Sequence, residues 1–522
     1  MWFSFATSYR NHREDGNWKM LGLVLVFFVS ALAADSRALK ELQTSISSLI
    51  DQPKFVSMRW GMLIMTADGQ VLFERDADKA FLPASTMKLF TGAVALHVLG
   101  PDCTMRTSVY TTQSMHAGVV HGDLILYGRG DPTLSGRFEL ENPYSLDSLA
   151  YQKTNSGIES LADQIKAQGI KRITGSLIGD ESFFLSRKLG PGWECDDTQA
   201  YYAAEISALT VNDNCLSLTV APSSIGTAPT ITVLPQTEYV KILNTARTSE
   251  SGQTCIGIHR PLNSNTIEIF GTIPRGAKEF KSLISIHDPA LFAATLLKEA
   301  LARRGIKVMQ GVRRMDALSR MAQPCAVSKL FEVAHVTSQP MSNIVKLMNK
   351  VSQNLYAELL LRHIGIAQGS VQVDQYGRPQ PAEARGNEMR RSFLEIVGID
   401  LQPLKLHDGS GLTRHNQLTP RATVRLLHYM LTHRESASFL DSLPLAGVDG
   451  TLEHRMKGTS AANNVRAKTG MQGAVNALSG YVTTKKGRLL IFSCIANNYI
   501  VPTPEIMKIY DQIGALLADY VG

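Results

Sequence analysis

The sequence predicts an α+β fold in which the two ends of the chain build one sheet and a large β-rich module is inserted between them. Residues 60–74 and residues 477–496 each have the pattern of two strands joined at a short turn, so each predicts a β-hairpin. Two hairpins at opposite ends suggest a single sheet. From about residue 100 to 286, short β-like runs alternate with Gly, Pro, Asn and Ser, which is typical of an insertion. The clearest of these runs are residues 123–128, 173–179, 216–221 and 266–273.

Length and composition set the scale of the molecule. The 522 residues are 44% hydrophobic and 19% charged, which is ordinary globular composition and enough for two or three domains. The formal charge of +7 is spread without a run of like charges, so nothing predicts a nucleic-acid-binding arm. This charge supports only a mild attraction to anionic surfaces, and membrane lipid and acidic cell-wall polymers both fit that description.

The N-terminus predicts export. Basic residues precede the apolar run 20–32, and residues 31–33 have the small-x-small form of a signal-peptidase site. The run is short for a membrane span of about 20 residues, so a cleaved signal at 1–33 is favoured over a retained anchor. Any membrane association of the mature chain is then expected to be peripheral at most.

The main domain is predicted to comprise residues 34–98 and 286–522, with the inserted module at 99–285. The Asp-Pro pair at 288–289 supplies an N-cap and a first-turn proline, opening a helix through Arg304 with which the main domain resumes. The chain should end in a helix that begins near Pro504 and lies on the sheet. One face of that helix carries Ile506, Ile509, Ile513, Leu516 and Leu517. A membrane-surface helix is the alternative, which the low number of basic residues disfavours.

The six cysteines do not predict a metal site. They include no Cys-x-x-Cys pair, and no histidines cluster near them at zinc spacing, so no metal or other cofactor is expected. In an oxidising compartment some could pair, and Cys195, Cys215 and Cys255 lie nearest together in sequence. For each cysteine a structural or free thiol is an equally open interpretation.

The only Ser-x-x-Lys in the chain, Ser85-Thr86-Met87-Lys88, looks like a nucleophile with its own base. If the segment is helical from about Ser85, residues three apart share a face, so the Lys88 amine can reach the Ser85 hydroxyl. Lysine accepts that proton only when burial or a neighbouring cation lowers its pKa. An N-cap followed by a surface lysine is the ordinary alternative. A catalytic interpretation therefore requires a second cation and a polar relay elsewhere in the chain.

The relay is predicted at the only Ser-x-Asn, Ser352-Gln353-Asn354, which lies within or beside an apolar helical stripe spanning 344–359. In a turn at a helix junction the two outer side chains could point into one cleft. There a hydroxyl passes a proton and an amide orients a neighbour. A helix-capping pair of polar residues is the alternative for this triplet taken alone.

The second cation is predicted at the only Lys-Thr-Gly, Lys468-Thr469-Gly470, on a strand at the sheet edge before the second hairpin. Lys468 would disfavour protonated Lys88 and attract a substrate carboxylate, to which Thr469 could also donate. Gly470 would let a peptide lie along the strand. The N–H groups of residues 85 and 471 would form an oxyanion hole. A surface lysine entering a Thr-Gly turn is the alternative.

The order and context of the three motifs resemble the penicillin-recognising serine enzymes. The long separation between Ser85 and Ser352, with the local sequence, identifies the chain as a member of the D-alanyl-D-alanine carboxypeptidase/endopeptidase family, the class C low-molecular-mass penicillin-binding proteins. The similarity runs through almost the whole mature chain. It includes residues 128–134, 211–215, 348–358, 408–412 and 446–452.

The resemblance implies a transpeptidase/β-lactamase-like domain, with an antiparallel sheet flanked by helices and an all-helical lobe, carrying an inserted domain itself interrupted by another. It implies a periplasmic serine peptidase that acts on peptidoglycan stem peptides through an acyl-enzyme and is inhibited covalently by β-lactam antibiotics. Carboxypeptidase and endopeptidase activity cut the same bond type, so both stay open. The expected catalytic residues are Ser85, Lys88, Ser352 and Asn354, and the expected substrate-binding residues are Lys468, Thr469, Gly470 and Met471.

Two positions depart from the family pattern, and two other functions remain as alternatives. Gln353 stands where Asp or Asn is usual, and Met471 stands where Thr is usual, which removes a hydroxyl that would help hold a carboxylate. A β-lactamase or esterase of the same superfamily is disfavoured by the large insertion and by the lack of an obvious deacylating carboxylate. An inactive peptidoglycan-binding protein is disfavoured by the intact motifs.

Overall fold

The computed structural model describes residues 36–146, 155–325, 327–367, 369, 373 and 377–522. The predicted signal peptide at 1–33 lies outside these residues.

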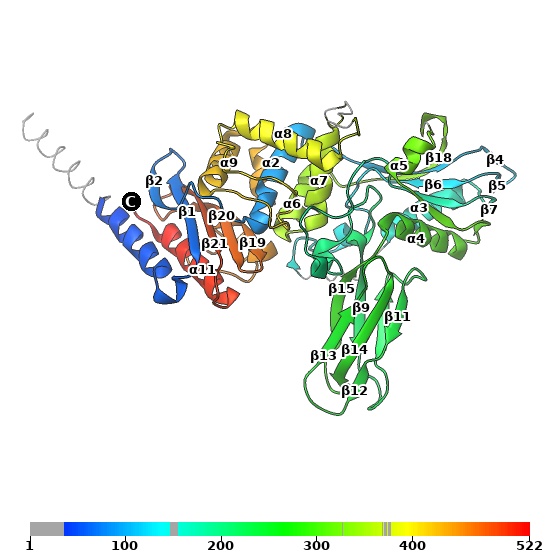
Figure 1. Cartoon of the computed structure of the whole chain (residues 1–522), viewed down its shortest axis with the longest axis horizontal. Helices are drawn as coiled ribbons and strands as arrows, with labels where there is room; N and C mark the ends of the chain where they lie inside the picture. The colour runs from blue at the N-terminus through cyan, green and yellow to red at the C-terminus, as the bar shows by residue number, and fades with distance from the viewer. Residues whose placement is uncertain (1–35, 147–154, 326, 368, 370–372, 374–376) are drawn as a thin grey trace, which may run out of the picture.

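The two ends of the chain build one antiparallel sheet, as predicted (Figure 1). Strand β1 pairs with β21 along its length, from Arg59 opposite Asn497 to Thr66 opposite Leu490, which joins the two predicted hairpins. Apolar side chains of alternating strand positions face helices on both sides of the sheet, so both faces are buried. The strand order is β19 (Arg466–Gln472), β20 (Val475–Thr483), β21 (Leu489–Asn497), β1 (Arg59–Thr66) and β2 (Val71–Arg75).

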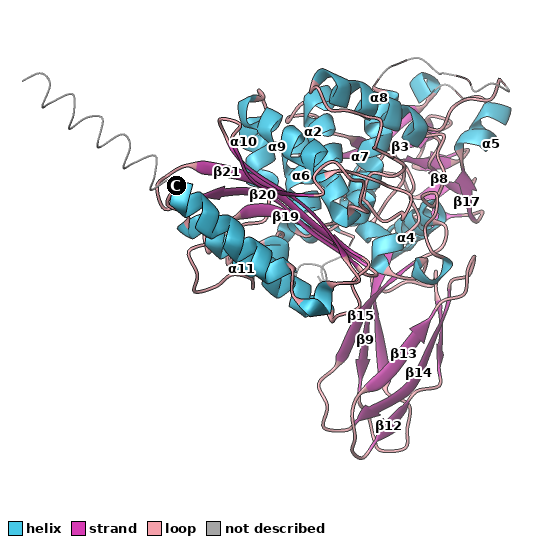
Figure 2. Cartoon of the chain, turned by 60° about the vertical axis from the view of Figure 1, so that its left-hand side comes forward, coloured by secondary structure: helices cyan, strands magenta, loops and turns pink. Residues whose placement is uncertain are grey.

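One face of this sheet is covered by the helix over residues 36–50 and by the terminal helix α11 (Thr503–Asp519), which lies across β19–β21 in Figure 2. The apolar face of α11 is buried against the sheet, as expected. The other face carries α2 (Met87–Leu99) and α9 (Pro420–Thr432) and the all-helical lobe. That lobe comprises α6 (Met341–Lys350), α7 (Asn354–Ile366), α8 (Ala382–Ile396) and α10 (Ser436–Ser442).

The inserted module begins after α2 and forms a first lobe built on two sheets. The larger sheet runs β17 (Val312–Met315), β8 (Leu177–Asp180), β6 (Leu124–Tyr127), β3 (Arg106–Thr111) and β18 (Phe331–Thr337). The smaller runs β16 (Lys307–Val308), β7 (Arg172–Ile173), β5 (Val119–Val120) and β4 (Met115–His116). The helices of this lobe are α3 (Ser156–Ala167), α4 (Pro289–Arg303) and α5 (Ala317–Ala322).

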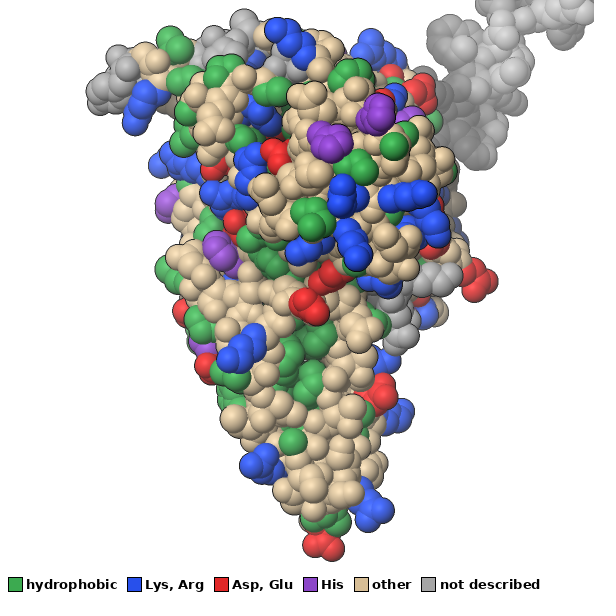
Figure 3. Space-filling model, turned by 90° about the vertical axis from the view of Figure 1, so that its right-hand side faces the viewer, with side chains coloured by type: hydrophobic (Ala, Val, Ile, Leu, Met, Phe, Trp, Pro, Cys, Tyr) green, Lys and Arg blue, Asp and Glu red, His purple; other side chains and the backbone are tan. Residues whose placement is uncertain are grey.

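A second lobe interrupts the first between β8 and α4 and projects away from the rest of the molecule (Figure 1). In Figure 3 it is the tapered lower part of the space-filling view. One of its sheets is β10 (Thr230–Leu234), β9 (Cys215–Ala221) and β15 (Phe280–Ser285). The other is β11 (Lys241–Asn244), β14 (Thr266–Pro274) and β12 (Arg247–Ser249), with β13 (Cys255–His259) also paired to β14.

The predicted end of the insertion at residue 285 is corrected by the strand pairing. Asp288 caps α4 as expected, accepting from Leu291 N at 3.3 Å, but the strands after α4 do not return to the main sheet. Strand β17 pairs with β8 and β18 pairs with β3, so 289–337 belong to the first inserted lobe. Capping signals locate a helix start but carry no information about which distant strand the next segment will join.

The chain leaves and re-enters the main domain at adjacent points. Met341 N donates to Cys103 O and Ser342 N donates to Pro101 O, both at 2.9 Å. The segment that follows α2 and the start of α6 therefore lie side by side, although the whole insertion separates them in sequence.

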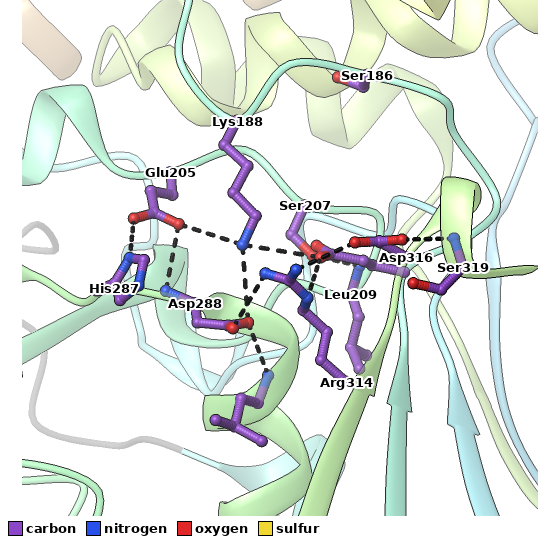
Figure 4. Close-up of polar contacts among 12 residues, drawn as sticks. Ser186, Lys188, Glu205, Ser207, Leu209, His287, Asp288, Arg314, Asp316 and Ser319 are labelled. Atoms are coloured by element: carbon purple, nitrogen blue, oxygen red, sulfur yellow. Dashed lines mark hydrogen bonds and ion pairs between the residues drawn. The ribbon is translucent and has the colours of Figure 1, made fainter. Parts of the chain in front are cut away.

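A partly buried group of charges joins the inserted lobes where their connecting segments meet (Figure 4). The Lys188 ammonium lies 3.8 Å from Glu181, 3.6 Å from Glu205 and 3.7 Å from Asp288. Arg314 pairs with Asp288 at 3.1 Å. These residues come from segments before and after the second lobe, so the ion pairs fix that lobe against the first.

Three predictions about small features can be compared with the described residues. Each of the six cysteines, all within the described ranges, is a free thiol. Within the same ranges no group of three or more His, Cys, Asp or Glu side chains is arranged to hold a metal ion. No helix in the described part of the chain combines the length and apolarity needed to span a bilayer.

Candidate active site

The predicted nucleophile and base lie one helical turn apart at the start of α2. Ser85 occupies a 3-10 turn (Ala84–Thr86) that continues into α2, and the Lys88 ammonium donates to Ser85 Oγ at 2.9 Å. Gly411 packs against this turn so closely that a Cβ would lie 1.8 Å from Ala84 O. Backbone of the 408–411 loop therefore holds the Ser85 turn in place.

Lys88 is fully buried and has three acceptors around its amine. Besides Ser85 Oγ, it donates to Asn354 Oδ1 at 2.6 Å and to Ser410 O at 2.8 Å. Burial lowers its pKa to about 7, although the negative charges of Asp408 and Glu358 act in the opposite direction. Lys88 thus holds a substantial neutral fraction near neutral pH, the form that can accept a proton.

Ser352 and Asn354 lie at the junction of α6 and α7, in the arrangement the sequence predicted. Ser352 adopts a left-handed conformation with φ 62°, which breaks the helix between the two polar side chains. Gln353 accepts from Leu355 N at 3.0 Å and so caps α7, which gives its departure from the family pattern a structural role. Asn354 is held at both ends, because its Nδ2 donates to Tyr202 O at 2.8 Å.

Lys468 brings the second amine into the same site from β19. It is fully buried and donates to Ser352 Oγ at 2.9 Å and to Thr469 O at 2.8 Å. Burial and then the charge of Lys88 hold the pKa of Lys468 well below its usual value. The sequence assigned the repulsion to Lys88. In the structure burial is the main cause of the Lys88 shift, and the repulsion acts on Lys468.

The rest of β19 forms the open side of the site. Gly470 faces the nucleophile turn so closely that a Cβ would lie 2.8 Å from Pro83 O and 3.2 Å from Ser85 N. Thr469 Oγ1 donates to Thr451 Oγ1 at 2.7 Å, and the Met471 side chain is 67% exposed. Strand β19 stands at the sheet edge with β20 on its inner side, so an extended peptide can add along its outer side.

These residues share a cleft of about 740 Å³ between the sheet edge, the helical lobe and the insertion. Ser85, Ser352 and Asn354 line it, while the two lysines lie buried behind them. The insertion supplies part of the wall through Tyr201 and Tyr202. All eight predicted site residues are therefore in or directly behind one cleft.

Sequence reasoning missed the loop that completes the surroundings of Lys88. Residues 408–412 carry part of the family resemblance, but none of them belongs to the expected catalytic set. In the structure Glu358 Oε1 accepts from Gly409 N at 3.0 Å and Ser410 N at 2.9 Å, and this loop presents Ser410 O to Lys88. Asp408 braces the same loop by accepting from Gly411 N at 2.8 Å. The Gly-rich run marks a tight loop, but a contribution made by a backbone carbonyl leaves no side-chain signature.

Comparison with known proteins agrees with this geometry. Residues 42–520 match the model of the D-Ala-D-Ala carboxypeptidase 3 (S13) family. A D-alanyl-D-alanine carboxypeptidase from Actinomadura sp. (strain R39) is 32% identical over 96% of this chain and 89% of its own length. The D-alanyl-D-alanine carboxypeptidase DacB of Haemophilus influenzae is 26% identical over 82% of this chain and 83% of its own length.

The fold is shared with a solved structure. The crystal structure of penicillin binding protein 4 from Haemophilus influenzae superimposes with a TM-score of 0.74 at 24% identity, covering 91% of this chain and 99% of that one. The predicted fold class and family are therefore confirmed. The family match and the Actinomadura relative both extend over nearly the whole described chain, and the chain belongs to the D-Ala-D-Ala carboxypeptidase 3 (S13) family.

Proposed function

We propose that the chain is a serine DD-peptidase of peptidoglycan that cleaves D-alanyl bonds through an acyl-enzyme on Ser85. Its substrates are stem peptides ending in D-alanyl-D-alanine, D-alanyl–diamino acid cross-links, or both. The observation that carries the proposal is the 2.9 Å contact between the Ser85 hydroxyl and a fully buried amine whose pKa is lowered to about 7. Family membership supplies the substrate class, since its relatives are named D-alanyl-D-alanine carboxypeptidases.

Acylation starts with proton transfer from the Ser85 hydroxyl to neutral Lys88 as the oxygen attacks the carbonyl carbon of the penultimate D-alanine. The developing oxyanion receives hydrogen bonds from the backbone N–H groups of Ser85 and Met471. Asn354 keeps the amine directed at Ser85, because its own amide is fixed between Lys88 and Tyr202 O.

Collapse of the tetrahedral intermediate expels the leaving amine, which needs a proton. Ser352 relays to it the proton that Lys88 took from Ser85, which leaves Lys88 neutral again, and Lys468 donates to the Ser352 hydroxyl oxygen at 2.9 Å. Lys468 binds the terminal carboxylate of the departing residue, and Thr469 lies beside it on β19, lining the same cleft. Water then attacks the acyl-enzyme, with Lys88 again as base, and releases the shortened peptide.

β-Lactam antibiotics enter the same cycle as covalent inhibitors, because they acylate Ser85 and their carboxylate occupies the position of the terminal one. The penicillin binding protein 4 of Haemophilus influenzae has been solved in complex with a β-lactam. The predicted signal peptide and the peptidoglycan substrate support the periplasm as the site of action. The neighbouring alternatives, a β-lactamase or an inactive wall-binding protein, become outcomes of the following experiment.

The purified mature protein should form a long-lived adduct on Ser85 with labelled penicillin and release D-alanine from pentapeptide or monomer from cross-linked muropeptide dimer. Mass spectrometry of the adduct and chromatography of the products measure both. Ser85→Ala is the matched control and should do neither. Rapid penicillin turnover without D-alanine or monomer release would identify a β-lactamase instead. Retained wall binding without an adduct would contradict the enzymatic proposal.

The rate of Ser85 acylation should rise with pH and level off above about 7. The reason is that only unprotonated Lys88 accepts the serine proton, and burial lowers the pKa of Lys88 to about 7. Stopped-flow acylation by a chromogenic cephalosporin, measured at constant ionic strength, gives the profile. An acid limb centred near the ordinary lysine value would contradict a neutral Lys88 base.

A further inference from the structure

We propose that Thr451 is a substrate-binding residue whose hydroxyl donates a hydrogen bond to the terminal carboxylate. It thereby replaces the hydroxyl that is missing at Met471. This inference rests on the proposed function. The family pattern places a threonine after Lys-Thr-Gly, whereas here Met471 has no hydroxyl and its side chain is mostly exposed. On the neighbouring turn, Thr451 lines the same cleft as Thr469 and Gly470.

The two threonine hydroxyls form a pair with one proton to spare. Thr469 Oγ1 donates to Thr451 Oγ1 at 2.7 Å. Two hydroxyls carry two protons, and the bond between them uses one, so the other is available to an acceptor entering the cleft. A carboxylate is the strongest such acceptor, and hydrogen bonds to charged groups exceed neutral ones in strength.

Lys468 lies beside this pair, and a carboxylate bound next to it favours the charged form of its amine, against the burial that lowers its pKa. Its amine contacts Ser352 Oγ and Thr469 O, which accounts for two of its three N–H donors. A carboxylate placed against β19 can thus meet an ammonium and a hydroxyl without any contribution from residue 471.

The turn that carries Thr451 is fixed from the same helix end that positions Ser352. Thr451 lies in a 3-10 turn (Gly450–Leu452) preceded by Asp449, whose carboxylate accepts from Lys350 Nζ at 2.8 and 2.6 Å. Gly450 has φ 56°, and a Cβ there would lie 2.3 Å from Lys350 O. Lys350 is the last residue of α6, two positions before Ser352. Lys350 therefore fixes the position of the Thr451 turn from the same helix end that leads into Ser352.

The test compares two acyl-D-alanyl thioesters that differ only in the leaving group, one ending in thioglycolate and the other in its carboxamide. Thr451→Val should lower kcat/KM for the thioglycolate ester about tenfold, mainly through KM, and leave the carboxamide ester within about twofold. Thr451→Ser should keep the wild-type preference. Adding Met471→Thr to Thr451→Val should restore the lost preference, because it supplies a hydroxyl after Gly470.

Each other outcome has a defined meaning. Equal losses of kcat/KM on both esters would show that Thr451 only supports β19. Unchanged kinetics would show that Thr451 does not contact the carboxylate. Either result overturns the role of Thr451 and leaves the proposed function standing. Thermal melting of each variant separates misfolding from lost binding. If Thr451→Val is less stable, the double variant still tests whether a hydroxyl at position 471 restores the preference for the thioglycolate ester. A wild-type protein that cleaves neither ester would instead overturn the proposed function and this role with it.

Discussion

Replacing Lys88 with methionine should slow acylation of Ser85 by about 10²–10⁴-fold, the usual contribution of a positioned general base. Methionine fills a similar volume but cannot accept the serine proton, while the Asn354 and Ser410 groups around it stay in place. Time courses of labelled penicillin incorporation measure the effect, with Ser85→Ala as the reference for complete loss.

The pH dependence of the free energy of unfolding of the same variant distinguishes loss of the base from disruption of the fold. Burial holds the pKa of Lys88 at about 7 in the folded protein, below its unfolded value, so between these values the unfolded chain binds more protons. Stability from this group is therefore lost as pH falls toward 7 and gained as pH rises from about 7 toward the unfolded lysine value. Urea titrations across that window should show a smaller rise for Lys88→Met. If the variant is acylated at the wild-type rate, or if its free energy of unfolding depends on pH as in the wild type, the assignment of Lys88 as a neutral base is wrong.

Replacing Glu358 with alanine should destabilise the protein by about 3–5 kcal/mol, because it removes the nearest carboxylate from a buried cation. Glu358 and Arg362 are each 1% exposed and pair at 3.1 Å, so the Arg362 guanidinium would keep only the more distant carboxylate of Glu383, at 3.9 Å. The same change removes the acceptor of Gly409 N and Ser410 N. Urea unfolding measures the loss.

An exposed ion pair offers the matched control for Glu358. Arg37 and Glu41 pair at 2.9 Å on the surface, with side chains 83% and 65% exposed. Glu41→Ala should therefore change stability by at most about 0.5 kcal/mol. A Glu358→Ala protein as stable as Glu41→Ala would mean that the buried pair contributes little. Unchanged acylation at Ser85 in a folded Glu358→Ala protein would mean that the 408–411 loop does not position Lys88.

The sequence was most informative where function depends on side chains within short motifs. Ser85 and Lys88 could be placed together because helical spacing brings residues three apart onto one face. The sheet followed from two hairpins with clear turns. The family resemblance then supplied what spacing could not, namely that Ser352 and Lys468 meet in the same cleft.

Contacts made by backbone atoms of distant segments could not be read from the sequence. Ser410 and Tyr202 each contribute a carbonyl oxygen to the site, and every residue type has one. The boundary of the insertion failed for a related reason. Strand β17 pairs in parallel with β8 across the entire second lobe, and no local pattern records so distant a partner.

The adjacent exit and re-entry of the insertion, at Cys103 and Met341, make the module topologically removable. The entropy of closing a loop grows only slowly with its length, by about 0.6 kcal/mol per doubling, so a long excursion with touching ends burdens the host fold little. A short linker across these points would reconnect α2 to α6 and leave the sheet continuous. Such a deletion would also remove the hydrogen bond from Asn354 to Tyr202 O and one wall of the cleft. The host sheet is thus complete without the insertion, but the helical lobe is not, because Phe184 and Ile206 of the insertion share a buried apolar cluster with α7. Catalytic competence is shared across the same boundary.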